Sequence, residues 1–306
     1  MSDTSRLSVL EIAALALIVL VWGVNNAAAM VGTQVLPPLL MGALRFVVAG
    51  VFLIPFVRPP FPNPKSLLLL VLFGGPIHYG LVYLAFAMAH DLSPIAVSLQ
   101  LWIPLTVLFG WWVLKEPPSG PAVAGLVVSF AGVAVMTADA RALRDWDAIL
   151  VGLAASAAWA LCTVLARRTV STPPLKMQGL LALGTAPTLG IATFVFEPDP
   201  VGAMVRADAL IWACVLWAGL ASSLFATALL FWLIQRREAG RVTPYLLATP
   251  VVSGAIGVAF MGDVLTAQII AGAVMTIGGV ALVALAEASL KRRSARLQDA
   301  AADAGA

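Results

Sequence analysis

The sequence predicts an all-α integral membrane protein, with ten transmembrane helices arranged as two inverted five-helix repeats around a central cavity. Three observations predict this fold: the composition, the spacing of the apolar runs and an internal repeat. Hydrophobic residues make up 61% of the 306 residues and charged residues 11%. Soluble domains are typically about 45–50% apolar and about 25% charged. So few charges cannot cover the surface of a water-soluble protein of this size.

Ten apolar runs follow one another along the chain, separated by short connections that hold most of the prolines and charges. A helix needs roughly 20 apolar residues to cross a hydrocarbon core about 30 Å thick. Backbone groups must be paired inside lipid, so runs of this length are expected to be helices. Too few residues remain for an extramembrane domain. The runs are 8–33, 38–57, 66–88, 94–114, 120–138, 147–166, 177–196, 208–234, 243–261 and 267–287.

The basic residues predict the orientation. Fourteen of the 18 lysines and arginines fall on the side that holds both termini, three fall on the other side, and Arg45 lies inside a run. Basic residues are enriched in cytoplasmic connections. We therefore expect a multi-pass protein of a bacterial-type inner (plasma) membrane with both termini in the cytoplasm, and we expect the first run to be retained as a helix.

The two halves of the chain resemble each other. The segment that starts at Ser93 is similar to the segment that starts at Gly240, with Pro104 matching Pro250 and Glu116 matching Asp263. We expect one repeat at 1–143, a second at 144–290 and a basic, then polar, cytoplasmic tail at 291–306. Five helices per half is an odd number, so the second repeat must enter the membrane from the opposite face. Inverted repeats recur in secondary transporters, with the substrate site near the midplane.

The sequence argues against several other classes of protein. It has no H-E-x-x-H motif and only two histidines, which disfavours an intramembrane metalloenzyme, and no G-K-[ST] nucleotide loop, which disfavours a primary pump. The net charge of +3 lies in connections and the tail, so we expect no nucleic-acid partner. We expect no cofactor, no metal and no catalytic residue, and Cys162 and Cys214 are expected to be free core residues. A channel remains an alternative.

Four ring-bearing residues are expected near mid-depth. At about 1.5 Å per residue, His78 lies about 18 Å from one face and Trp102 about 12 Å from the other. Trp22 and Trp159 fall at similar depths. Membrane tryptophans more often lie at the interfaces. These four residues are therefore candidates for lining a cavity that stacks and hydrogen-bonds a flat substrate, and helix packing is the alternative role.

Helical spacing adds polar candidates to the same site. Tyr79 and Tyr83 share one helix face, and Ser98 shares a face with Trp102. Asn25 and Asn26 form a stripe with Trp22, where they could bind the polar end of a substrate or bond neighbouring helices. The repeat-related Pro104 and Pro250 would each remove a backbone donor, so they are candidate helix breaks with a gating role or kinks needed for packing.

Arg45 lies about seven residues into the second run, where it could extend outward, pair with a carbonyl or bind a substrate carboxylate. A charge at the bilayer centre costs about 2.5–3.5 kcal/mol on insertion scales. No Asp or Glu lies at mid-depth. His78 is then the one group at that depth expected to titrate near neutral pH. Because no acid is available at mid-depth for proton coupling, uniport or exchange is expected rather than proton-driven antiport.

Several sequence segments together resemble the EamA family of the drug/metabolite transporter superfamily. They are WGVNNAAA in the first run, PLLMGALRF in the second, YLAFAMAHDLSPIAVSLQLWIPLTVLFGWWVLKEPPS from the third to the fifth, and the G-D-x-x-T of the second half. The resemblance covers nearly the whole chain, and the aromatic amino-acid exporter (YddG-like) branch is the nearest. It implies ten helices around a central cavity.

The resemblance also implies a function. We expect a secondary transporter that exports amino acids or related metabolites, aromatic ones foremost, by alternating access. Drug or other metabolite efflux is the alternative. The expected partners are a small-molecule substrate and the lipid bilayer.

Small residues of the fifth and tenth runs are expected to be packing positions, either within the chain or at a homodimer contact: Gly125, Ser129, Gly132, Gly272, Thr276 and Gly279.

Overall fold

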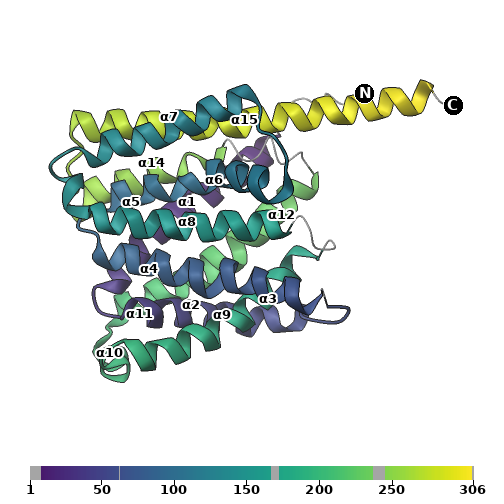
Figure 1. Cartoon of the computed structure of the whole chain (residues 1–306). Coiled ribbons are helices and arrows are strands. Elements are labelled where there is room, and N and C mark those ends of the chain that lie inside the picture. Colours follow the sequence, from purple (N-terminus) through teal and green to yellow (C-terminus); the bar gives the residue numbers. More distant parts are fainter. Residues whose placement is uncertain (1–7, 62, 167–171, 237–244, 305–306) are drawn as a thin grey trace.

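A computed structural model of the chain describes residues 8–61, 63–166, 172–236 and 245–304. Every regular element in these ranges is a helix. Nine helices of the described ranges are long and apolar enough to cross a membrane, and a tenth, Thr249–Met261, is shorter. The prediction of an all-α membrane protein with ten spans is confirmed. Figure 1 shows the helices lying side by side in one bundle.

The first half of the chain supplies five spans. Where α1 and α7 begin, the side chains of Ser8 and Ser119 accept hydrogen bonds from the first turn, and α2 and α3 begin with prolines, whose missing N–H costs nothing there. The third span continues from α3 through a π-helical segment, Phe73–Ile77, into α4. The helices are α1 (Val9–Thr33), α2 (Pro38–Leu53), α3 (Pro64–Leu72), α4 (His78–Met88), α5 (Leu92–Ser98), α6 (Trp102–Phe109) and α7 (Gly120–Thr137).

The second half repeats this order with two differences. A short helix, which the sequence did not predict, follows α9, and the last helix runs through most of the predicted tail. The first two residues of the predicted run 243–261 lie outside the described residues. The helices are α8 (Trp146–Ala166), α9 (Pro174–Phe196), α10 (Pro200–Arg206), α11 (Ala209–Leu216), α12 (Thr227–Arg236), α14 (Thr249–Ile256) and α15 (Ala267–Ala304).

The internal repeat is visible in the backbone. The fourth span ends in a π-helical segment, Gly110–Leu114, and the shorter span ends in another, Gly257–Met261. Each segment is closed by a residue with a left-handed backbone, Lys115 (φ 61°) in the first half and Gly262 (φ 81°) in the second. These two residues are 147 positions apart, which is also the spacing of the acids that follow them.

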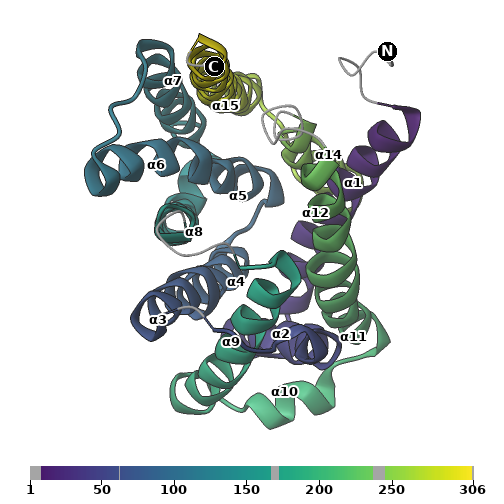
Figure 2. The same ribbon diagram turned by 90° about the vertical axis from the view of Figure 1, so that its right-hand side faces the viewer.

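The fifth and tenth spans pack against each other through their small residues. Figure 2 shows α7 and α15 side by side at one edge of the bundle. A Cβ added to Gly279 would lie 2.4 Å from the backbone N of Ser129, and one added to Gly132 would lie 2.5 Å from the backbone N of Thr276. The small residues are therefore confirmed as packing positions within one chain, and these faces are not free to form a dimer contact.

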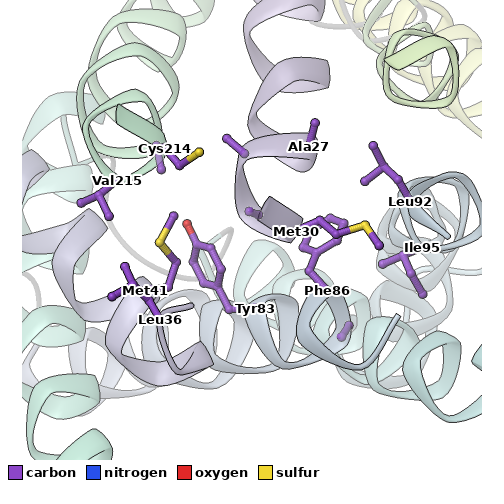
Figure 3. Packing of buried hydrophobic residues seen from close by; sticks show 14 of the residues in the cluster. Ala27, Met30, Leu36, Met41, Tyr83, Phe86, Leu92, Ile95, Cys214 and Val215 are labelled. Atoms are coloured by element: carbon purple, nitrogen blue, oxygen red, sulfur yellow. The ribbon is translucent and has the colours of Figure 1, made fainter. Parts of the chain in front are cut away.

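The largest core cluster joins both halves of the chain. Figure 3 shows Tyr83 and Phe86 on α4, with Met41 of α2 beside Tyr83 and Met30 of α1 beside Phe86. Tyr83 is fully buried. The same cluster includes Cys214 of α11, which is free and buried, as is Cys162 of α8.

Two carboxylates also join the halves, at the end of the bundle away from the first residue of α1. Asp263 accepts hydrogen bonds from the backbone N–H groups of Leu92 (3.1 Å) and Ser93 (2.8 Å) and from the Ser93 hydroxyl. Glu197 accepts two backbone N–H groups of the first turn of α2, at 2.7 and 3.1 Å. Each acid satisfies N–H groups that a helix N-terminus leaves without an intrahelical partner.

Candidate functional site

Four rings from three helices, α2, α4 and α8, meet within the bundle. The His78 ring centre lies 4.6 Å from that of Tyr79 and 4.9 Å from that of Trp159, and Tyr79 lies 4.6 Å from Phe46. His78, Tyr79 and Trp159 are only partly buried. Aromatic rings favour the edge-on geometry seen at Tyr79. We refer to His78, Tyr79, Trp159 and Phe46 as the ring cluster; it contains residues of both halves of the chain.

A break in the third span places His78 and Tyr79. Gly75 has a non-helical backbone (φ −112°, ψ −106°) and is followed by Pro76, which has no N–H to donate. A Cβ on Gly75 would lie 2.2 Å from the Thr185 hydroxyl oxygen of α9, so this approach requires glycine. The helix resumes at His78, which puts the imidazole at the start of a new helical segment facing α8.

The imidazole of His78 is held by the backbone of α8. Its Nδ1 lies 2.8 Å from the carbonyl oxygen of Ala155. A carbonyl oxygen only accepts hydrogen bonds, so Nδ1 carries the proton. In the neutral ring, Nε2 is then left as an acceptor. A ring nitrogen that accepts, beside two aromatic faces, suits a flat molecule with an N–H donor.

Arg45 of α2 adjoins the ring cluster. Its guanidinium carbon lies 4.7 Å from the centre of the Tyr79 ring. Nε donates to the hydroxyl of Ser223 (2.8 Å), Nη2 to that of Ser222 (3.3 Å) and Nη1 to that of Tyr83 (3.3 Å). The side chain is buried and does not extend outward, and hydroxyl groups rather than a carbonyl accept its hydrogen bonds. Arg45 thereby connects α2 and α4 to the π-helical segment Trp217–Ala226.

The structure brings some of the predicted site residues together and separates others. His78, Tyr79 and Trp159 are in mutual contact, and Tyr83 reaches the cluster through Arg45. Ser98 is fully buried and donates to the carbonyl of Ile95. Trp102 packs instead against the core formed by α6, α8 and α15. Among the described residues, ring contacts link Trp102 to no member of the ring cluster.

The stripe on α1 points to other neighbours. Trp22 packs against Leu15, Ile18 and Leu233, toward α12. Asn26 Nδ2 donates to the Ser253 hydroxyl of α14 (3.0 Å), so this amide bonds a neighbouring helix. Asn25 is buried, and its Oδ1 has no hydrogen-bond partner within the described ranges. Among the three residues of the stripe, Asn25 is therefore the one whose side-chain oxygen is available to accept a hydrogen bond.

Pro104 and Pro250 occupy equivalent places. Pro104 is the third residue of α6, after a 3-10 turn at Leu99–Leu101, and Pro250 is the second residue of α14. Each therefore stands in the first turn of a helical segment that restarts after an irregular turn. A proline is tolerated there because the N–H it lacks would have no intrahelical acceptor.

Sequence reasoning missed Ser222, Ser223 and Phe46. Two adjacent serines within a long apolar run were a usable signal, since buried hydroxyls in lipid need partners. They fall in a ten-residue π-helical segment, Trp217–Ala226, which changes the angular position of every side chain after it. Phe46 is one apolar residue among many in its run and gave no signal.

Comparison with known proteins decides the family. The model of the EamA-like transporter family matches residues 9–138 and again residues 146–285. The chain belongs to the EamA-like transporter family. It is a multi-pass membrane transporter and not an enzyme. The resemblance seen in the sequence is thereby confirmed at the level of the family, and the aromatic amino-acid exporter branch is not singled out.

Curated relatives and a solved structure agree with this assignment. A "probable amino-acid metabolite efflux pump" of Salmonella typhimurium is 26% identical over 278 residues, covering 86% of this chain and 91% of the relative. The protein of the same name in Escherichia coli is also 26% identical. An uncharacterized transporter of Archaeoglobus fulgidus is 25% identical over 88% of this chain and 96% of its own. A crystal structure with 22% identity matches with a TM-score of 0.61 over 89% of this chain and 96% of that one, which indicates a shared fold.

Proposed function

We propose that this transporter exports amino acids or related small metabolites, aromatic amino acids foremost, from a site at the ring cluster. The observation that carries the proposal is the contact of His78 and Tyr79 with Trp159, which brings ring faces of both halves of the chain together. The names of the two efflux relatives support amino-acid metabolites as the substrate class.

Alternating access follows from the two-half construction. A site between inverted repeats is reached from one side when one half rocks against the other, and from the opposite side after the reverse movement. We propose that both termini are cytoplasmic, on the basis of the basic connections. No acid lies in the middle of any apolar run, so the transporter works by uniport or exchange without proton coupling.

Counterflow in proteoliposomes tests the proposal. Vesicles loaded with unlabelled tryptophan or phenylalanine would receive labelled amino acid outside, with and without a pH gradient. The native chain is compared with Trp159→Ala. The matched control is Trp112→Ala, because the Trp112 side chain is 69% exposed at the surface of the bundle. Uptake that overshoots equilibrium requires exchange by a carrier, so this assay also separates a carrier from a channel.

The expected result is saturable counterflow that ignores the pH gradient, is lost in Trp159→Ala and persists in Trp112→Ala. Trp159→Ala must also elute as a single species by size exclusion, so that loss of transport is not loss of folding. Absence of counterflow for both tryptophan and phenylalanine in the native chain would refute aromatic amino acids as the substrates, and a panel of other amino acids, metabolites and drugs would follow. Passive leak that saturates with no overshoot would favour a channel.

A further inference from the structure

The guanidinium of Arg45 is a buried charge surrounded by neutral groups. The residue is 6% exposed. Its hydrogen-bond acceptors are three hydroxyls, those of Tyr83, Ser222 and Ser223. The ring face of Tyr79 covers the guanidinium. None of the ion pairs found between described residues includes Arg45.

Such an arrangement leaves the charge incompletely stabilised. Burying a cation is unfavourable unless it is paired and its donors are satisfied. Ionisable residues inside membrane proteins commonly mark substrate or ion paths and pair with an opposite charge. Hydroxyl dipoles and an aromatic face offset part of the cost. They do not supply the opposite charge, and the middle of the apolar runs contains no Asp or Glu to do so.

The hydrogen-bond count points the same way. A guanidinium has five N–H donors. Three have acceptors among the described residues: the single N–H of Nε, one on Nη1 and one on Nη2. One N–H on each terminal nitrogen therefore remains. A carboxylate accepts two hydrogen bonds from such a pair, and charged partners make these bonds roughly twice as strong as neutral ones.

We infer that Arg45 is the anion-binding residue of the substrate site and that the transported molecule carries a free carboxylate. Tyr79 contacts both the guanidinium and the His78 ring, so one molecule placed beside Tyr79 reaches both. The inference rests on the proposed function in taking the ring cluster as the substrate site. The chemical group that the site requires is then a carboxylate. Flat cations, which the rings alone would accept, are repelled by Arg45.

Matched competitors test the inference on the native protein. In the tryptophan counterflow assay, the external competitor is tryptophan, indole-3-acetate, tryptamine or tryptophanamide. Indole-3-acetate keeps the carboxylate and lacks the amine, whereas tryptamine and tryptophanamide lack the carboxylate. We expect the two acids to compete at least tenfold more strongly than the two compounds without a carboxylate. Competition by tryptamine within about twofold of tryptophan overturns the inference and leaves aromatic amino-acid transport standing.

Variants at Arg45 separate binding from packing. In Arg45→Gln the ratio of acid to amide competition should fall toward one, whereas Arg45→Lys should keep a preference for acids. A purely structural arginine predicts that all competitors weaken together with an unchanged ratio, and that result overturns the inference. If Arg45→Gln does not fold, the competitor series on the native chain decides alone.

A second measurement, a thermal-shift screen, tests Arg45 even if the proposed function is wrong. If the native chain carries no amino acid, the purified protein is screened by thermal shift against small carboxylic acids and their amides. Stabilisation by acids but not by their amides upholds Arg45 as an anion site while refuting the amino-acid assignment. Stabilisation by neither class, or by both equally, overturns the inference.

Discussion

The imidazole Nδ1 of His78 donates a 2.8 Å hydrogen bond to the carbonyl oxygen of Ala155, one helical turn before Trp159. This bond ties α4 of the first half to α8 of the second. It also orients the His78 ring so that Nε2 is the nitrogen left for a ligand. The two halves are thus joined at the ring cluster by a directional contact as well as by packing.

Replacing His78 by phenylalanine tests the role of its nitrogens. His78→Phe keeps an aromatic ring beside Tyr79 and Trp159 but removes the donor to Ala155 and the acceptor at Nε2. We expect tryptophan counterflow to fall about tenfold, the effect of about 1.4 kcal/mol. His90→Phe is the matched control, because the His90 side chain is 63% exposed at the end of the bundle. Native transport by His78→Phe would reduce the histidine to a packing residue.

Adjacent glycines in α15 provide a paired test of the α7–α15 contact. A Cβ at Gly279 would lie 2.4 Å from the backbone N of Ser129, whereas a Cβ at Gly278 meets nothing within 4 Å. Overpacking costs typically about 1–3 kcal/mol. Gly→Ala in a helix gains about 1 kcal/mol when the site has room. Thermal unfolding in detergent should show a lower midpoint for Gly279→Ala and an unchanged or higher one for Gly278→Ala. Equal midpoints would contradict this packing.

Removal of the Asp263 carboxylate should destabilise the protein more than removal of a single cap. Asp263→Ala leaves the N–H groups of Leu92 and Ser93 and the Ser93 hydroxyl without their acceptor. A buried donor without a partner costs about 1–3 kcal/mol. The control is Asp208→Ala, because Asp208 caps α11 through the N–H of Ile211. The thermal midpoint should fall further for Asp263→Ala, and the reverse order would refute the idea that Asp263 joins the two halves.

The pH dependence of stability should carry a contribution from Asp91. Burial, then the neighbouring carboxylates of Asp263 and Asp145, raises the pKa of Asp91 above its ordinary value of 3.8, against the opposing charges of Arg144 and Arg141. The folded state therefore favours the protonated acid. The Asp91 contribution to stability is greatest below about pH 3.8 and falls as pH rises through the raised pKa. Asp91→Asn stays neutral and should lack this fall.

Asp199 gives the opposite sign and serves as the control for Asp91. Its bonds with Arg206 and the N–H of Gly202 lower the pKa of Asp199. Its contribution is present above the ordinary value and is lost as pH falls through the lowered pKa. Thermal midpoints of the native chain, Asp91→Asn and Asp199→Asn would be measured from about pH 3 to about pH 7. A native profile that matches Asp91→Asn throughout would contradict the Asp91 prediction.

The sequence predicts the spans well because lipid leaves the backbone few choices. The predicted run 120–138 corresponds to the span Gly120–Thr137 in the structure, and the predicted run 177–196 corresponds to the span Pro174–Phe196. Long apolar runs bounded by prolines and charges are expected to lie within the bilayer. A helix pairs every backbone N–H and C=O group within one segment, so these runs form helices there. The proximity of His78 and Trp159 could also be predicted from the sequence, because the depth of a residue along a helix follows from the rise of about 1.5 Å per residue.

Angular position around the helix was not predictable. Ser98 and Trp102 share a face only if the winding between them is α-helical. Leu99–Leu101 form a 3-10 turn, which advances each residue by about 20° more than an α-helix, so the two side chains drift apart by about 60°. The hydrogen bonds of Ser222 and Ser223 with Arg45 could not be predicted for the same reason: both serines lie in a π-helical segment, which changes their angular positions. Local winding depends on neighbouring helices, which a single sequence does not reveal.

The pairing of α7 with α15 also sets an order of assembly. The glycine face of α7 is complete when residue 137 has been made, but its partner face on Gly272 and Gly279 of α15 is synthesised much later. At about 5–20 residues per second, the gap of 147 residues lasts roughly 7 to 30 s. Throughout that interval the first half sits in the membrane with a close-packing surface uncovered. This face of α7 is therefore accessible to other membrane proteins until α15 has been made and covers it.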